Sequence, residues 1–274
     1  MVSSRLKAVR RRSGLLRAPV ALGLAAAALY LLALLPLLAI ALRVPPGALW
    51  ARLGEPVARE ALLLSVTTSL AATGLCMALG MPAAYLLARY RFRGREWVDT
   101  LADLPMTVPP VVAGVGLLMA FGRMGLVGRY LEALGVQVAF STLAVVLAQA
   151  FVAMPFFYKA ARAGFEAVDP ELEATALTLG ADRRRAFLYV TLPLARPALL
   201  AGLTLTWARA MSEFGATLMF AGNLPGRTQT LPLAVMTAME SDLETALALA
   251  LVSVLAAAAA LLLAKRALAA TGGD

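Results

Sequence analysis

The segment Asp169–Pro193 reads DPELEATALTLGADRRRAFLYVTLP and separates two long apolar stretches of a 274-residue chain. Asp169 is a favourable helix N-cap, and Pro170 suits the first helical position. Gly180 can adopt the left-handed conformation that ends a helix, and Asp182 can start a second one. That second helix must stop by Pro193, because proline removes a backbone donor and clashes with the preceding turn. We therefore predict a short helix, a glycine turn and a second short helix between two membrane spans.

The first of these helices carries an apolar stripe, because Leu172, Ala176 and Leu179 recur at helical spacing. The basic run Arg183–Arg185 follows and is expected near the membrane surface. One interpretation is an amphipathic hairpin that lies on lipid. The other is a surface that a cytoplasmic partner protein holds. The residues by themselves leave both interpretations open.

The composition of the chain excludes several classes of protein. Hydrophobic residues make up 61% of the chain, and the mean hydropathy is +0.80, which is more than a soluble domain needs. The net charge of +9 does not indicate a nucleic-acid partner, because the basic residues lie at the ends of apolar stretches. The chain has no histidine and one cysteine, Cys76, which we interpret as a buried thiol. We expect no metal site, no catalytic residues and no cofactor in this chain.

Six charge-poor intervals are long enough to cross a bilayer, whose apolar core needs about 20 helical residues. They are residues 18–42, 61–88, 104–122, 133–158, about 197–220, and 245–264. The predicted fold class is therefore all-α, a polytopic membrane protein with six transmembrane helices. The first interval could belong to a cleaved signal peptide, but its 25 apolar residues favour an uncleaved anchor.

The distribution of basic residues predicts the orientation and the domain organisation. Eighteen Lys and Arg residues lie in the N-terminal tail, the second and fourth loops and the C-terminus, against six on the other side. The positive-inside rule places both termini in the cytoplasm. We predict a basic tail at residues 1–17, a membrane domain at residues 18–268 that includes a cytoplasmic loop at residues 160–196, and a C-terminal tail at residues 269–274.

Two ionisable residues lie inside the fifth interval. Arg209 follows Arg196 by 13 residues, which places it ~20 Å into the bilayer at the helical rise. Glu213 is one helical turn further and is expected on the same face. The pair could be a structural ion pair that neutralises itself, or the polar wall of an anion pathway to which Ser212 and Thr217 add hydroxyls. We favour the structural pair and keep the pathway as the alternative.

A proline cluster marks the start of the third interval, with Pro105, Pro109 and Pro110 close together. These residues must bend or end the helix, because they remove several backbone donors. A broken helix inside a bilayer needs protein or water to satisfy the freed carbonyls. We therefore interpret the cluster as a candidate gate.

The capped loop resembles the cytoplasmic EAA motif of bacterial ABC importer permeases. Nine residues separate Gly180 from Val190-Thr191-Leu192-Pro193, which matches the Ile/Val-x-Leu-Pro end of that motif. The usual Glu-Ala-Ala aligns with Ala174-Thr175-Ala176, and the nearest glutamate is one place earlier, at Glu173. In that family the loop forms a coupling helix that docks in a groove of the ATPase subunit. The resemblance implies an ATPase-coupling role for Glu171, Glu173, Ala174, Thr175, Ala176, Gly180 and Ala181.

A second block, Arg209–Met239, is similar to molybdate ABC transporter permeases. It contains Ser-Glu-Phe-Gly-Ala-Thr, then Gly-Asn-Leu-Pro-Gly and Thr-Gln-Thr-Leu-Pro-Leu-Ala. The sulfate/thiosulfate permeases are similar and tend towards Gly-Glu-Tyr-Gly in the first part. The resemblance runs from about Glu60 to the C-terminus and includes Leu104–Pro110. It implies a type I ABC importer permease fold.

The resemblance also implies the function and the partners. The chain is expected to be the permease subunit of an ATP-driven importer for molybdate, with tungstate as a further substrate and sulfate as the alternative. Two copies would form the pore in the cytoplasmic membrane, with ATPase subunits inside and an oxyanion-binding protein outside. The chain lacks a Gly-x-x-x-x-Gly-Lys-Ser/Thr loop, so ATP hydrolysis is expected on another subunit. An ion-coupled secondary carrier is a competing class, although the inverted repeats of such carriers are not evident in the sequence.

Overall fold

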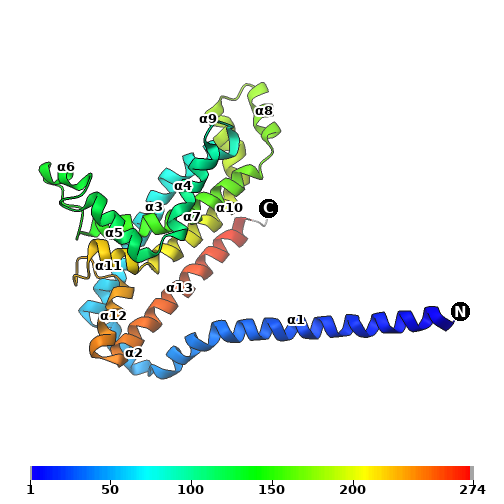
Figure 1. The fold of residues 1–274 in the computed structure, drawn as a ribbon, viewed down its shortest axis with the longest axis horizontal. Helices are drawn as coiled ribbons and strands as arrows, with labels where there is room; N and C mark the ends of the chain where they lie inside the picture. Colours follow the sequence, from blue (N-terminus) through cyan, green and yellow to red (C-terminus); the bar gives the residue numbers. More distant parts are fainter. Residues whose placement is uncertain (1, 272–274) are drawn as a thin grey trace.

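The computed structural model describes residues 2–271, and within this range the chain is helical without a β-strand (Figure 1). The helices are α1 Val2–Arg43, α2 Pro46–Leu53, α3 Pro56–Arg89, α4 Arg95–Thr107, α5 Pro110–Phe121, α6 Gly128–Ala133, α7 Thr142–Glu166, α8 Pro170–Thr178, α9 Arg183–Ala186, a π-helical turn η1 Phe187–Thr191, α10 Leu192–Met211, α11 Gly215–Ala221, α12 Leu231–Ser241 and α13 Leu243–Thr271. The predicted all-α class is confirmed.

Four long helices, α3, α7, α10 and α13, form the bundle, with α8 and α9 at one end and α2 and α12 at the other (Figure 1). Small residues let the helices approach closely. A Cβ added at Gly80 would lie 2.9 Å from the ring of Phe157, and one added at Gly202 would lie 2.7 Å from Cβ of Ala160. Such contacts replace the hydrophobic driving force that is missing between helices in lipid.

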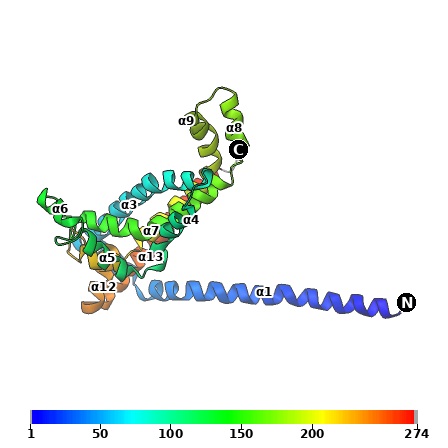
Figure 2. The ribbon, with the colours of Figure 1, turned by 45° about the horizontal axis from the view of Figure 1, so that its top comes forward.

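Helix α1 extends away from the bundle in both views (Figures 1 and 2). The stretch Leu22–Arg43 has the length and hydropathy of a membrane span, and none of its most apolar window is buried. The basic residues of the predicted N-terminal tail continue this helix from Val2. Met1 and residues 272–274 of the predicted tails lie outside the described residues.

Within residues 2–271, four helices are long and apolar enough to cross a membrane: Leu22–Arg43, Pro56–Arg89, Thr142–Glu166 and Arg183–Met211. The pair α4 and α5 passes the same test as a broken span with a bend of 114°. The sixth predicted span coincides with α13, of which Leu243–Ala259 is a shorter apolar segment. The order of the spans follows the prediction, and the count of six stays a prediction.

The break that the proline cluster predicts in the third span, residues 104–122, is confirmed, because α4 ends at Thr107 and α5 begins at Pro110. One predicted boundary is wrong, that of the fourth span. The fourth was expected to begin at residue 133, but α7 begins only at Thr142, after the short helix α6 and a loop. Ser141 fixes that start, since its hydroxyl accepts a hydrogen bond from the backbone N–H of Ala144. An uncharged sequence does not by itself show where the helix begins.

The second helix of the capped loop was expected to stop by Pro193, and this prediction is also wrong. The chain stays helical from Arg183 through η1 into α10. In the π turn the N–H of Leu192 donates to the carbonyl of Phe187, one residue further back than in an α-helix. The extra residue lets the chain pass into the first turn of α10, where Pro193 is tolerated. The fifth span therefore begins at Arg183 and not near Pro197.

Candidate functional site

Helix α8 has the caps that the sequence predicts. The carboxylate of Asp169 accepts a hydrogen bond from the N–H of Glu171 at 2.9 Å. Gly180 has a φ of 93°, and the N–H of Ala181 donates to the carbonyl of Ala176 at 3.0 Å, as in a Schellman motif. Asp182 then accepts a hydrogen bond from the N–H of Arg185 at 2.7 Å and starts α9. The loop is thus a defined structure in the isolated subunit.

Helix α8 is exposed along its length: none of its nine residues is buried in the described chain. Leu172, Leu177 and Leu179 expose 47%, 43% and 84% of their surface, respectively. Ala176 of the predicted apolar stripe is half-buried, as is Ala181, while Glu171, Ala174, Thr175 and Gly180 are exposed. An apolar surface of this kind at the tip of the molecule fits a partner protein or lipid.

Glu173 is the exception on α8, because its side chain turns back into the subunit. Its Oε1 accepts from Nε of Arg89 at 2.8 Å and from the hydroxyl of Thr191 at 2.5 Å. Its Oε2 accepts from the hydroxyl of Tyr85 at 3.2 Å. A cleft of about 610 Å³ adjoins this group and is lined by Tyr85, Arg89 and Glu173 together with Met81, Pro82, Tyr90, Leu177, Arg183, Arg184, Ala186 and Phe187.

The two charged residues of the fifth span do form an ion pair, but not along one continuous helix. Helix α10 ends at Met211, and Glu213 lies in the break before α11. Nη2 of Arg209 lies 2.7 Å from Oε2 of Glu213, whose side chain is 1% exposed. The other carboxylate oxygen of Glu213 accepts a hydrogen bond from the N–H of Ala216 at 2.8 Å, at the start of α11. Glu213 therefore neutralises the charge of Arg209 and also accepts a hydrogen bond from a backbone N–H at the start of α11.

The hydroxyls predicted beside this pair differ in their surroundings. The hydroxyl of Ser212 is exposed and donates to the carbonyl of Arg209 at 3.1 Å. Thr217 is fully buried, and its hydroxyl has no hydrogen-bond partner among the described residues.

The break in the third span lies at the proline pair, while Pro105 lies inside α4 without ending it. The structure brings this break against the one in the fifth span. A Cβ added at Gly215, directly after the second break, would lie 3.2 Å from Cβ of Pro110. One added at Gly114 of α5 would lie 2.7 Å from the carbonyl oxygen of Ala216. The proline break and the start of α11 thus meet in one contact between α5 and α11, which includes Pro110 of the candidate gate.

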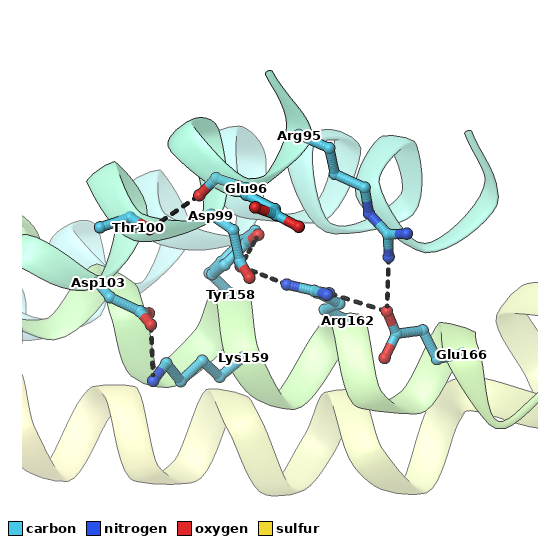
Figure 3. A network of polar contacts seen from close by, with 9 residues as sticks. All are labelled: Arg95, Glu96, Asp99, Thr100, Asp103, Tyr158, Lys159, Arg162 and Glu166. Carbon is cyan, nitrogen blue, oxygen red and sulfur yellow. Dashed lines mark hydrogen bonds and ion pairs between the residues drawn. The ribbon is translucent and has the colours of Figure 1, made fainter. Parts of the chain in front are cut away.

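A network of charged side chains holds α4 against α7 (Figure 3). Asp99 accepts a hydrogen bond from the hydroxyl of Tyr158 at 2.9 Å and pairs with Arg162. Glu166 bridges Arg162 at 2.9 Å and Arg95 at 3.2 Å. The ion pair between Lys159 and Asp103, at 3.0 Å, extends the network towards the proline break.

This network was not predicted from the sequence, although a signal was present. Arg95, Asp99 and Asp103 recur every four residues on one face of α4. Arg162 and Glu166 have the same spacing on α7. Complementary charges at helical spacing on two neighbouring segments indicate a contact between them, but they do not show which residues pair.

Residues 77–269 match a protein family described as Binding-protein-dependent transport system inner membrane component. The chain is 47% identical over 224 residues to the molybdenum transport system permease protein ModB of Mycobacterium tuberculosis, covering 82% of this chain and 85% of that protein. It is 41% identical over 183 residues to the protein of that name from Escherichia coli K12, covering 66% of this chain and 80% of the relative.

Solved structures show a similar fold. A chain of the MetNI methionine ABC transporter, in inward-facing conformations, superposes with a TM-score of 0.62 over 78% of this chain and 96% of that chain. The sequence identity of 14% means that this likeness concerns the fold alone.

Proposed function

This chain belongs to the family of binding-protein-dependent transport system inner membrane components, and we propose that it is the permease subunit of an ATP-driven importer of molybdate. The observation that carries the proposal is the 41–47% identity to molybdenum transport permeases over most of the chain. The family match at residues 77–269 includes both the capped loop and the pair Arg209–Glu213. The permease itself is not an enzyme, since ATP hydrolysis belongs to a separate subunit.

The protein is a multi-pass protein of the inner membrane and works with an ATPase and a substrate-binding protein. We propose that both termini are cytoplasmic, with α8 and α9 on the cytoplasmic side. The bias of 18 against six basic residues in the loops and tails supports this orientation. It places the exposed helix α8 where an ATPase subunit can reach it.

We propose that α8 is the coupling helix and that two exposed leucines, Leu172 in α8 and Leu179 at its C-cap, enter a groove of the ATPase. Their exposure and the capped geometry of Asp169 and Gly180 support this role. A helix that is already formed loses little conformational entropy when it binds, which favours a stable contact. Among the carboxylates of the motif, Glu171 is exposed and free to face the ATPase, whereas Glu173 is held inside the subunit.

We propose that two copies of the chain form the pore and that the contact between α5 and α11 lies beside the anion path. Helix α5 exposes Val111, Val112 and Met119, which supports a further protein surface against it. The unpartnered hydroxyl of buried Thr217 supports a polar group or water in this region. Arg209 and Glu213 are best explained as a structural pair, because Glu213 also caps α11.

The test is oxyanion uptake into proteoliposomes that hold this chain, its ATPase and its binding protein, with ATP inside and no ion gradient. We expect molybdate uptake that tungstate blocks and excess sulfate does not. The matched control contains a non-hydrolysable ATP analogue and should show no uptake. Equal competition by sulfate would move the substrate to sulfate. Uptake that ignores ATP and follows a proton or sodium gradient would refute the importer and indicate a secondary carrier.

A further inference from the structure

The carboxylate of Glu173 joins three segments that are distant in the sequence. It belongs to α8, and its partners are Arg89 and Tyr85 at the end of α3 and Thr191 in the π turn η1. The side chains of Arg89 and Glu173 are only 9% and 17% exposed. A charged pair this well covered is more strongly coupled than a pair on the open surface.

Further contacts hold the α3 side of this group in place. Arg89 uses its Nη2 to donate to the carbonyl of Val168 at 3.0 Å, directly before the cap of α8. The ring of Tyr85 packs edge-on against Phe165, with centroids 5.5 Å apart, and against Phe187, with centroids 4.9 Å apart. The end of α3 therefore holds both the start of α8 and its first turn.

The other side of the group is a π turn. Thr191 is fully buried, and it is the last residue of η1, directly before α10 begins. The wider hydrogen-bond pattern of a π turn is less stable than an α-helix and commonly marks a functional position. The hydroxyl of Thr191 thus ties α8 to the point where α10 changes its helical geometry.

Helix α8 has little else to hold it. It contains no buried residue in the described chain, and it packs mainly on η1 and α9. Without an apolar anchor, the orientation of α8 depends on the polar contacts of Glu173. A force applied to the exposed leucines of α8 then reaches the bundle through these contacts.

We propose that Arg89, Glu173 and Thr191 form a joint that passes the displacement of α8 to α3 and α10, so that Glu173 is a positioning residue and not a contact of the ATPase. This inference rests on the proposed function, because it assigns a path for motion that the ATPase supplies. It also explains the shifted glutamate of the motif. A shift of one residue rotates a side chain by ~100° on a helix, which turns it from the partner towards the subunit.

The test measures two rates on the reconstituted complex, molybdate uptake and ATP hydrolysis, and takes their ratio. For Glu173→Gln we expect the ATPase to remain bound and active, while the uptake per ATP falls by about tenfold or more. Thr191→Val keeps the shape and removes one donor, so we expect a fall of about threefold. Glu96→Gln, at an exposed glutamate of α4 outside this group and outside the proposed ATPase contact, is the matched control and should leave the ratio unchanged. Arg89→Glu combined with Glu173→Arg should recover part of the ratio.

Two outcomes would overturn the joint, and a third would refute the proposed function instead. A wild-type ratio in both Glu173→Gln and Thr191→Val would overturn the joint. Loss of the bound ATPase in Glu173→Gln, with Thr191→Val at the wild-type ratio, would also overturn it and make Glu173 a docking contact. Failure of the unmodified complex to import molybdate with ATP would instead refute the proposed function, which separates the two failures.

Discussion

Replacing Glu213 by glutamine is the sharpest test of the buried ion pair. The change keeps the size of the side chain, and its amide oxygen can still accept the hydrogen bond from the N–H of Ala216. It removes the negative charge that lies 2.7 Å from Arg209. The variant therefore isolates the cost of leaving the guanidinium without a counter-charge.

The expected cost follows from the burial of the two side chains. Glu213 is 1% exposed and Arg209 is 26% exposed, so the pair is largely shielded from solvent. Breaking a buried pair costs ~3–5 kcal/mol, and polar contacts within membranes are worth less on average, so we expect a loss of ~2–3 kcal/mol for Glu213→Gln. Glu213→Ala also removes the cap of α11 and should lose a further ~1 kcal/mol.

The assay is reversible unfolding of the purified chain in mixed micelles, combined with uptake in proteoliposomes. The double variant Arg209→Met with Glu213→Gln removes both charges. Its unfolding free energy should lie within ~1 kcal/mol of that of the unmodified chain. Regained stability with regained uptake would confirm a structural pair. Regained stability without uptake would show that Arg209 acts on the anion. A loss of unfolding free energy below ~0.5 kcal/mol in Glu213→Gln would refute the reasoning, because the guanidinium of Arg209 would then have another partner.

Four further changes test other parts of the structure. Gly180→Ala has room for its Cβ, but a φ of 93° is unfavourable for alanine, so a strain of ~1–2 kcal/mol should weaken ATPase capture, measured by co-purification. Gly114→Ala meets the carbonyl of Ala216 at 2.7 Å and should cost ~1–3 kcal/mol in thermal unfolding. Leu179→Asp should weaken ATPase binding by about tenfold and leave the unfolding temperature unchanged, because Leu179 is 84% exposed. Asp99→Asn should loosen α4 by ~1 kcal/mol, seen as faster amide exchange in α4 but not in α13.

Local features of the capped loop could be predicted well. The Asp169 cap, the left-handed Gly180 and the Asp182 cap all occur as the sequence indicates. These features involve residues at most a few positions apart, so their geometry depends on the backbone of one turn. The presence and order of the apolar segments could be predicted for a similar reason, because the bilayer sets the length of a span.

The boundaries inside the membrane could not be predicted in the same way. An interval with few charges shows that a segment is apolar, but α7 begins at Thr142 and α10 ends at Met211 for reasons of packing and capping. Pro193 was expected to stop a helix, and a π turn allows the helix to continue. Propensity is a weak guide where the surrounding helices satisfy the backbone.

The sequence by itself determined the class of protein, the apolar segments, the charge bias of the loops and the capped helix, because each depends on composition or on neighbours along the chain. Only the tertiary structure decided which charged groups meet. Arg89 and Glu173 are 84 residues apart, and Tyr158 and Asp99 are 59 apart. Helices that are apolar on most sides do not reveal their rotation, so the direction of a side chain is fixed only when neighbouring helices pack against it.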